Sequence, residues 1–280
     1  AVGENSEQTW QAMLSGRSGI APITLFDASD FNVKIQAEVK IEPEKLLQLD
    51  GRVKAKQLKH MNRSVKFALL SALEALDDSQ LEVCEKNADE IGIIFGSGAG
   101  GSEILLKGQE TLRTKGAKRI SPFLIANFIV DAASGHIAIA TGARGPNMAI
   151  SSACATGTTA IGEAYSTIAR GDASAIITGS SDAVLLPIFH ATWTSMRALS
   201  RNTGNPSQSM RPFDLERDGF IAGEGGAAFI LENYEHALAR NAKVYAEIIG
   251  YGSANDAHDM IALDVSGKGA QIFSTFPLTC

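Results

Sequence analysis

Cysteine is scarce in this sequence, and its scarcity argues against a fold held together by disulfides. The 280 residues include three, Cys84, Cys154 and Cys280, which are far apart and odd in number. Secreted disulfide frameworks use an even set of closely spaced cysteines, whereas thiols stay free in a reducing compartment. No cysteine–histidine spacing suits a metal such as zinc, and nothing requires an organic cofactor. We therefore expect a cytoplasmic chain, with an organellar targeting segment before Ala1 left open.

Long apolar runs and an excess of positive charge are missing as well. No run approaches the roughly 20 apolar residues that a membrane-spanning helix needs. The opening, AVGENSEQTW, lacks the basic and apolar regions of a secretory signal. The formal net charge is −6, whereas proteins that bind duplex nucleic acid are more often basic. The sequence therefore predicts no membrane partner and no nucleic-acid partner.

Short apolar runs alternate with helical patterns along the chain. The runs typical of buried strands are residues 90–98, 146–153, 174–182, 225–232 and 244–252. Periodic segments that predict helices lie between or beside them, chiefly 59–77, 154–170 and 233–240. Apolar strands separated by helices are typical of a mostly parallel sheet covered on both faces. The predicted fold class is α/β.

Basic residues recur at steps of three and four within residues 52–76, which also carry an apolar stripe of helical spacing. At about 3.6 residues per turn, the basic residues would share one separate face of a helix. They are Arg52, Lys56, Lys59, Arg63 and Lys66. Such a face is usually only solvated, and the alternative is a docking surface for an acidic partner. The residues alone leave both interpretations open.

Cys154 lies where an apolar strand is predicted to meet the start of a helix, in the stretch AISSACATGTTAIG (149–162). A helix N-terminus favours a thiolate, and small neighbours give a substrate and an oxyanion access to backbone N–H groups. The common alternative is a buried structural cysteine. A nucleophile also needs an acid or base, usually histidine. No histidine lies in a recognisable catalytic motif, the five being His60, His136, His190, His236 and His258.

Two glycine-rich stretches stand apart from the predicted elements. GSGAGG (96–101) looks like a phosphate-binding loop but lacks the Lys-Ser/Thr of a P-loop, so backbone close to a ligand pocket is favoured. RPFDLERDGFIAGEGG (211–226) mixes arginines with carboxylates and glycines. There we expect ion pairs within an ordered loop rather than a metal site.

These stretches, together with KRISPF (118–123) and RALS (197–200), resemble the beta-ketoacyl-[acyl carrier protein] synthases, most closely the synthase I/II group. The resemblance follows the family's order from residue 1 to about residue 271. It implies a thiolase-like α-β-α-β-α fold of two similar halves, normally a homodimer. Residues 1–243 would be the N-terminal half without its first strand. Residues 244–280 would begin the C-terminal half, and they diverge after about residue 271, as expected of a chain truncated at both ends.

The resemblance also implies a reaction of fatty acid biosynthesis and the residues that serve it. Cys154 would accept an acyl chain from an acyl carrier protein, with its own N–H as one oxyanion donor. Malonyl carrier protein would then lose carbon dioxide, and the resulting carbanion would attack the acyl thioester. Ala99 and Trp193 would line the acyl pocket. The acidic carrier protein would dock on Lys56, Lys59, Lys118, Arg119 and Arg197.

The family's two active-site histidines, its active-site lysine and its second oxyanion amide come from loops of the C-terminal half. Those loops have no counterpart in this sequence, so we expect the chain alone not to catalyse condensation. A polyketide-type ketosynthase stays open as an alternative, because the same motifs serve both substrate classes. A partner subunit that binds acyl chains or carrier protein without condensing them is a further alternative. The cysteine at 154 weighs against it, since such a partner needs no thiol.

Overall fold

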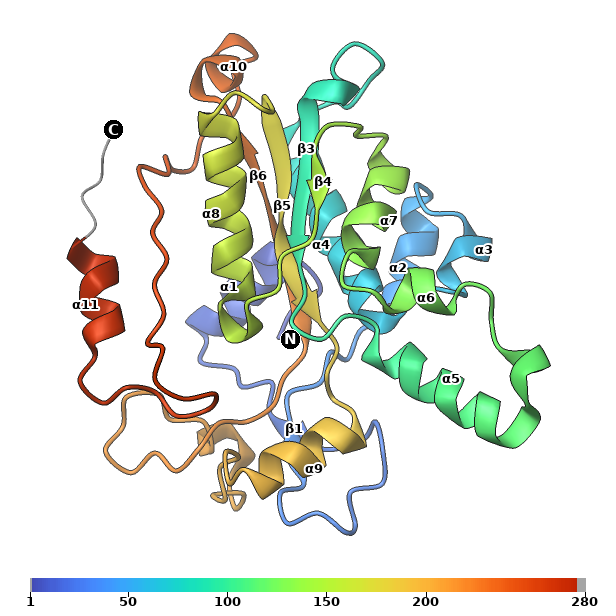
Figure 1. Cartoon of the computed structure of the whole chain (residues 1–280), viewed down its shortest axis with the longest axis vertical. Coiled ribbons are helices and arrows are strands. Elements are labelled where there is room, and N and C mark those ends of the chain that lie inside the picture. The colour runs from blue at the N-terminus through green and yellow to red at the C-terminus, as the bar shows by residue number, and fades with distance from the viewer. Residues whose placement is uncertain (1, 276–280) are drawn as a thin grey trace.

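A computed structural model describes residues 2–275, without the side chains of residues 273–275, so that Cys280 lies outside the described part. Its central sheet has the order β4-β3-β5-β6 (Figure 1). β3 runs parallel to both β4 and β5, and β6 runs antiparallel to β5. The strands are β3 (Ile91–Gly96), β4 (Asn147–Met148), β5 (Ala175–Asp182) and β6 (Gly225–Glu232). Four of the five predicted apolar runs therefore form the mostly parallel sheet that was expected.

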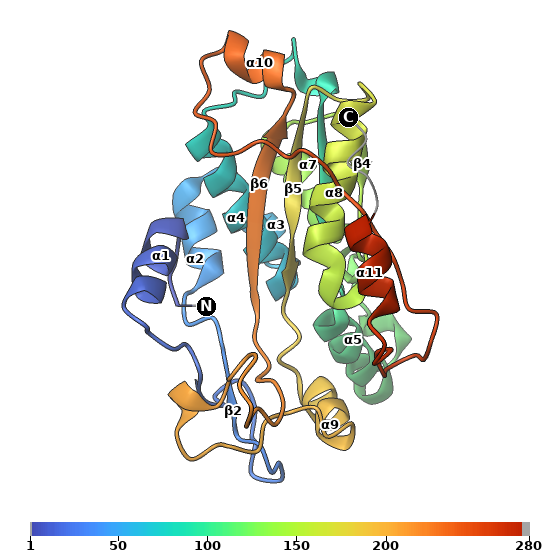
Figure 2. The same cartoon turned by 90° about the vertical axis from the view of Figure 1, so that its left-hand side faces the viewer.

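Helices cover both faces of this sheet, as Figures 1 and 2 show. One face packs against α4 (Arg63–Ser79) and α7 (Ala132–Thr141), and the other against α8 (Thr156–Ala169). On β3, Ile93 belongs to the core under α4 and α7, whereas Ile94 belongs to the core under α8. Because successive side chains of a strand point to opposite faces, a strand buried on both faces is apolar throughout. The layers correspond to one half of the predicted α-β-α-β-α arrangement.

Short elements complete the described chain. The remaining helices are α1 (Ser6–Leu14), α2 (Pro43–Asp50), α3 (Ala55–Leu58), α5 (Ser102–Lys115), α6 (Leu124–Phe128), α9 (Pro187–Ser195), α10 (Tyr234–Ala239) and α11 (Lys268–Thr275). A two-stranded ribbon pairs β1 (Ala21–Pro22) with β2 (Ile35–Gln36). The 3-10 turns are η1 (Ala88–Glu90), η2 (Ala117–Arg119), η3 (Ala153–Ala155) and η4 (Pro206–Gln208). Within residues 2–275, no helix has the length and apolar character needed to cross a bilayer.

The predicted continuous basic helix is wrong. α2 ends at Asp50 and is followed by Gly51, whose φ of 82° is left-handed, and the short α3 ends at Leu58. α4 begins only at Arg63, because the side chain of Asn62 accepts a hydrogen bond from the Val65 N–H at 2.9 Å and caps the helix. The apolar stripe is nevertheless buried as predicted, since its members on α3 and α4 belong to the core beneath the sheet.

The predicted strand at 244–252 is also wrong. This segment runs as irregular chain beside α8, and Tyr251 packs so closely on Gly162 that an added Cβ would lie 2.1 Å from the tyrosine ring. Because α8 lies between this segment and the sheet (Figure 1), no strand of the described chain is adjacent to complete a ladder of backbone hydrogen bonds.

A buried ion pair ties α4 to the segment that enters β6. The Glu224 side chain is 1% exposed, and Arg63 binds it through Nη2 at 2.7 Å and Nε at 2.9 Å. The same two side chains hold Val39, whose N–H donates to Glu224 at 3.0 Å and whose carbonyl accepts from Arg63 at 2.8 Å. One charge pair thus joins three distant parts of the chain.

Replacement of Arg63 by alanine leaves the Glu224 carboxylate buried without a countercharge. We expect Arg63→Ala to lower the free energy of unfolding by about 3–5 kcal/mol, measured by urea denaturation. Arg113→Ala is the matched control, because both partners of its ion pair with Glu110 are more than half exposed. Arg113→Ala should lower the free energy of unfolding by less than about 1 kcal/mol. Equal losses in the two variants would contradict this assignment.

Candidate active site

The candidate site lies at the edge of the sheet where the parallel strands end. β3 ends at Gly96, directly opposite Ser180 of β5, and β5 ends two residues later at Asp182. β4 leads through residues 149–152 into η3 and α8. Since parallel strands carry their carboxyl ends at one edge, residues from three distant stretches meet there. This edge is the lower end of the sheet in Figure 1, where α5, the start of α8 and α9 also lie.

Cys154 occupies the bend between β4 and α8. Its side chain is exposed, and it lies in the 3-10 turn directly before the helix. The preceding Ala153 has a φ of 50°, which is left-handed and costs an alanine about 1 kcal/mol. Thr156 holds the bend, because its hydroxyl accepts from the Ser152 N–H at 2.9 Å and donates to the Ala153 carbonyl at 2.7 Å. The strained bend therefore presents the thiol outward, as a nucleophile requires.

The Cys154 N–H makes no hydrogen bond to any residue from 2 to 275. A free backbone donor beside an exposed sulfur is the arrangement that an oxyanion needs when a thiol attacks a carbonyl carbon. These are the two groups that the family resemblance implies for acyl transfer, and their role stays a prediction.

Two glycines allow the bend to sit close to the sheet. A Cβ on Gly96 would lie 2.3 Å from Thr156 Cγ2, and a Cβ on Gly157 would lie 2.8 Å from Ser180 Oγ. A Cβ on Gly96 would also lie 2.9 Å from the Ile150 carbonyl oxygen, so hydrogen is required there, whereas a Cβ on Gly157 would make the Ser180 hydroxyl move. The small residues around Cys154 thus have a packing role that the sequence did not reveal.

The GSGAGG turn does not offer its N–H groups to a phosphate. The Gly98 N–H donates to Asp182 Oδ2 at 2.9 Å, and the Ala99 N–H donates to Asp182 Oδ1 at 3.1 Å. The turn lies against the bend, since a Cβ on Gly98 would be 3.6 Å from the Ala153 carbonyl oxygen. Ala99 is thereby half-buried near the candidate nucleophile. Sequence reasoning missed Asp182, although an acidic residue at the end of an apolar strand was a usable signal.

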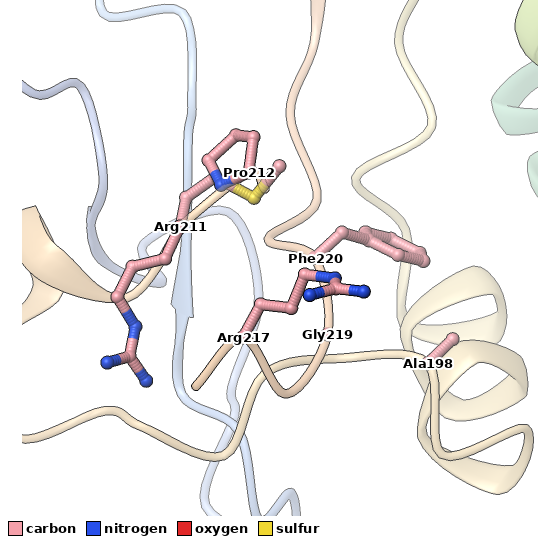
Figure 3. A pocket seen from close by; sticks show the side chains of 7 residues that line it. Ala198, Arg211, Pro212, Arg217, Gly219 and Phe220 are labelled. Atoms are coloured by element: carbon pink, nitrogen blue, oxygen red, sulfur yellow. The ribbon is translucent and has the colours of Figure 1, made fainter. Parts of the chain in front are cut away.

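Trp193 belongs to an aromatic cluster at the same end of the molecule. It lies on α9, stacks on Phe189 with centroids 5.8 Å apart, and meets the edge of Phe220 at 5.8 Å. Phe220 also borders a surface hollow of about 430 Å³, shown in Figure 3. The hollow is lined by Ala198, Met210, Arg211, Pro212, Arg217, Gly219 and Phe220. Neither Cys154 nor Ala99 lines it, so it is separate from the bend.

The arginines of this hollow are held by their own loop. Arg211 lies 3.3 Å from the Glu216 carboxylate, which confirms one of the ion pairs expected there. Arg217 donates instead to the backbone carbonyl of Asp214 at 2.7 Å. In Figure 3 the Arg211 guanidinium points away from the hollow, whereas that of Arg217 turns toward Phe220.

No histidine contacts Cys154 within the described residues. Each makes its contacts elsewhere or is exposed: His60 against Phe123, His136 with Asn127, His190 with the Val33 carbonyl, His236 with Glu232, and His258 at the surface. Burial lowers the pKa of His136, which suits a neutral structural residue on α7. The histidines that α7 and α9 carry are structural, as the sequence indicated for His136.

The five predicted docking residues are exposed and have no ion-pair partner among residues 2–275; they are Lys56, Lys59, Lys118, Arg119 and Arg197. His60 and Phe123 stack with centroids 4.6 Å apart. This contact brings the chain after Lys59 to the chain after Arg119. Arg197 follows α9, at the lower end of Figure 1.

The other basic residues of the predicted face are used inside the fold. Arg52 pairs with Asp50 and Asp77, and Lys66 pairs with Glu44 at 3.0 Å. Arg63 pairs with the buried carboxylate of Glu224. The structure therefore separates internal ion pairs from cations that are free for a partner, which periodicity could not do.

The close approach at Gly96 generates a test of the bend. Gly96→Ala must push Thr156 away from the sheet, and we expect it to lower the free energy of unfolding by about 1–3 kcal/mol. Gly135→Ala on α7 is the control, because nothing lies within 4 Å of its added Cβ. Alanine forms helices better than glycine, so the control substitution should raise the free energy of unfolding by up to about 1 kcal/mol. If both variants shifted the urea midpoint in the same direction from that of the wild-type chain, the packing role would be refuted.

Comparisons with known proteins agree with this geometry. A curated relative from Synechocystis sp., named 3-oxoacyl-[acyl-carrier-protein] synthase 2, is 42% identical over 96% of this chain and 64% of its own length. The crystal structure of a beta-ketoacyl synthase from Burkholderia phymatum STM815 has a TM-score of 0.83 at 26% identity, over 95% of this chain and 65% of that chain.

A third similar protein is a type II PKS ketosynthase solved in complex with its acyl-carrier protein, AntDE:AntF. It has a TM-score of 0.79 at 28% identity, over 98% of this chain and 65% of that chain. The present chain thus spans about two thirds of the length of these proteins. The family model described as "Beta-ketoacyl synthase, N-terminal domain" matches residues 1–237. The chain therefore belongs to the beta-ketoacyl synthase family.

Proposed function

We propose that this chain accepts an acyl group on Cys154 as part of a 3-oxoacyl-[acyl carrier protein] synthase of fatty acid biosynthesis. The observation that carries the proposal is the exposed thiol at a strained bend, beside its own unused N–H. The name of the relative that is 42% identical supports the substrate class. A structural cysteine would be buried and would not need a left-handed alanine before it.

The proposed transfer is a thioester exchange. The Cys154 sulfur attacks the carbonyl carbon of an acyl thioester, and a new carbon–sulfur bond forms. The carbonyl oxygen becomes an oxyanion that accepts a hydrogen bond from the Cys154 N–H. The bond to the carrier's sulfur then breaks, and that thiol leaves with the proton that Cys154 gave up.

Decarboxylative condensation with malonyl carrier protein is the second step of the proposed reaction. It needs groups that hold the malonyl thioester and stabilise the carbanion, a task usually given to histidine. Among residues 2–275 no histidine contacts Cys154, so we assign only the acyl transfer to this chain alone. We also propose that residues 1–243 form the N-terminal half of the fold and that residues 244–280 begin the C-terminal half.

We propose the cytoplasm as the compartment of this protein, in keeping with the free thiols of Cys84 and Cys154.

The acyl pocket in this proposal runs past Ala99, with Trp193 at its mouth. Ala99 is half-buried in the turn that lies against the bend. Its small side chain leaves room where a larger one would block an acyl chain. Trp193 lies on α9, which Figure 1 shows at the same end of the sheet as the start of α8.

An acidic acyl carrier protein is the proposed partner, docked on Lys56, Lys59, Lys118, Arg119 and Arg197. Their exposure and lack of internal partners leave their charge available. The similar ketosynthase solved with its acyl-carrier protein supports this kind of complex. Opposite charges across such an interface speed association and fix its orientation.

A homodimer is the proposed assembly, with the edge at β4 as its contact. β4 has two residues, pairs only with β3 among residues 2–275, and leaves Met148 40% exposed. An unpaired edge of this kind is suited to pairing with a second copy.

A polyketide-type ketosynthase is the second candidate, favoured by the similar ketosynthase of a type II PKS at 28% identity. The relative named 3-oxoacyl-[acyl-carrier-protein] synthase 2 is 42% identical, and this greater identity supports the first candidate. A partner subunit that does not transfer acyl groups agrees less well with the exposed Cys154.

Acylation of the chain by octanoyl-pantetheine tests the proposed transfer. Mass spectrometry should show one octanoyl group on the wild-type chain and on Cys84→Ala, and none on Cys154→Ala. Cys84 is the matched control, because it is also free and exposed but lies far from the carboxyl edge of the sheet. Equal labelling of both cysteines, or no labelling at Cys154, would contradict the proposal.

Charge reversal at Lys118 tests the docking surface. Lys118→Glu should weaken the binding of an acidic acyl carrier protein on the order of tenfold at low ionic strength, because a like charge then faces the partner. Lys86→Glu makes the same charge change near the opposite, amino end of β3 and should leave the affinity unchanged. Calorimetric titration gives both dissociation constants, and an equal effect of the two variants would rule out this surface.

A further inference from the structure

Asp182 holds the GSGAGG turn through both carboxylate oxygens. Oδ1 accepts from Ser97 Oγ at 2.8 Å and from the Ala99 N–H at 3.1 Å, and Oδ2 accepts from the Gly98 N–H at 2.9 Å. A carboxylate can accept several hydrogen bonds at once, and bonds to a charged acceptor are the strong ones. One side chain thus fixes three consecutive residues.

The rest of the turn is closed by its own chain. The Gly100 N–H donates to Ser97 Oγ at 2.8 Å, and the Gly101 N–H donates to the Phe128 carbonyl at 2.9 Å. Four consecutive N–H groups, of the kind that elsewhere bind an anion, are therefore all occupied. The carboxylate of Asp182 takes the place of a bound anion and holds the glycine-rich turn in one conformation.

Asp182 is itself held rigidly. It ends β5, and the neighbouring Ser181 is 2% exposed and donates from Oγ to the Ser64 carbonyl at 3.0 Å. Ser64 returns a hydrogen bond from its hydroxyl to the Ser181 carbonyl at 2.9 Å. The carboxylate is thus anchored to both β5 and α4, and it transmits that rigidity to the turn.

The turn touches the bend that carries the thiol. Gly98 approaches the Ala153 carbonyl, and Gly96 packs on Thr156, whose hydroxyl donates a hydrogen bond to that same carbonyl and stabilises the bend. Ala99 is held between these contacts and Asp182. A displacement of the turn therefore moves the pocket wall relative to the Cys154 sulfur.

We propose that Asp182 is a positioning residue for acyl transfer, which holds the wall at Ala99 against the Cys154 bend and so sets the preference for long over short acyl chains. This inference rests on the proposed acyl transfer to Cys154. Asparagine at 182 keeps the shape but offers one acceptor oxygen, so its amide N–H groups must face either the Gly98 N–H or the donors of Ser97 and Ala99. The turn must then open, whereas the thiol and its N–H stay in place.

The test measures two ratios of rates at Cys154 in a background with Cys84→Ala and Cys280→Ala, which leaves Cys154 as the one cysteine of the chain. One compares octanoyl-pantetheine with acetyl-pantetheine, and the other compares N-octylmaleimide with N-ethylmaleimide, which needs no acyl transfer. We expect Asp182→Asn to lower both ratios on the order of tenfold, because a misplaced wall costs the long chain its contacts. Asp182→Glu, which keeps both acceptors, should recover part of the loss. Asp172→Asn is the control, since its ion pair with Arg170 is about half exposed, and it should leave both ratios unchanged.

The two ratios separate the two claims. Unchanged ratios in Asp182→Asn, with normal acylation of the wild-type chain, would overturn the role of Asp182 and leave the proposed function standing. A lowered maleimide ratio without any acylation of the wild-type chain would support the positioning role and reject the acyl transfer. If Asp182→Asn does not fold, Ser97→Ala removes one of the three hydrogen bonds to Asp182, together with the one that Ser97 Oγ accepts from the Gly100 N–H. It should lower the maleimide ratio by a smaller factor, and no change would again overturn the inference.

Discussion

The closeness of α8 to the ends of β3 and β5 is the constraint on which the candidate site depends. Gly96 and Gly157 remove the side chains that would keep the helix away from the sheet. The bend before the helix is then tight enough to force Ala153 into a left-handed conformation, and Thr156 holds it there. Cys154 lies in this bend with its side chain exposed. The same closeness places the Asp182-held turn against the bend, so the proposed nucleophile and the proposed pocket wall are held by the same strand ends.

Charge is divided in this molecule between internal pairs and free cations. Arg63 is committed to the buried Glu224, where removal of either partner would leave an uncompensated charge. Lys59, Lys118 and Arg119 have no such partner in the described chain, although Lys59 is only four residues from Arg63. Fixed pairs maintain the geometry of the sheet, and the free cations form the surface that we propose for an acidic partner.

The sequence was informative where local pattern and burial coincide, and silent where distant residues meet. β3 and β5 could be predicted because burial on both faces leaves a continuous apolar run, and Cys154 because small residues separate such a run from a helix. The run at 244–252 looked the same, but an apolar run does not tell whether a neighbouring strand exists. The prediction of one basic helix face was wrong because the spacing of the basic residues continues across the helix ends at Gly51 and Asn62. Asp182 was missed because its partners lie 83 to 85 residues away and only strand pairing joins them.

A crystal structure of the chain with an octanoyl group on Cys154 tests the central claim, that this bend and turn form an acyl-accepting site. The account predicts a thioester oxygen within hydrogen-bonding distance, about 3 Å, of the Cys154 nitrogen. It also predicts an octanoyl chain that runs along Ala99, with Asp182 still bound to the turn. An acyl chain that points into solvent, or a thioester oxygen turned away from the Cys154 N–H, would contradict it.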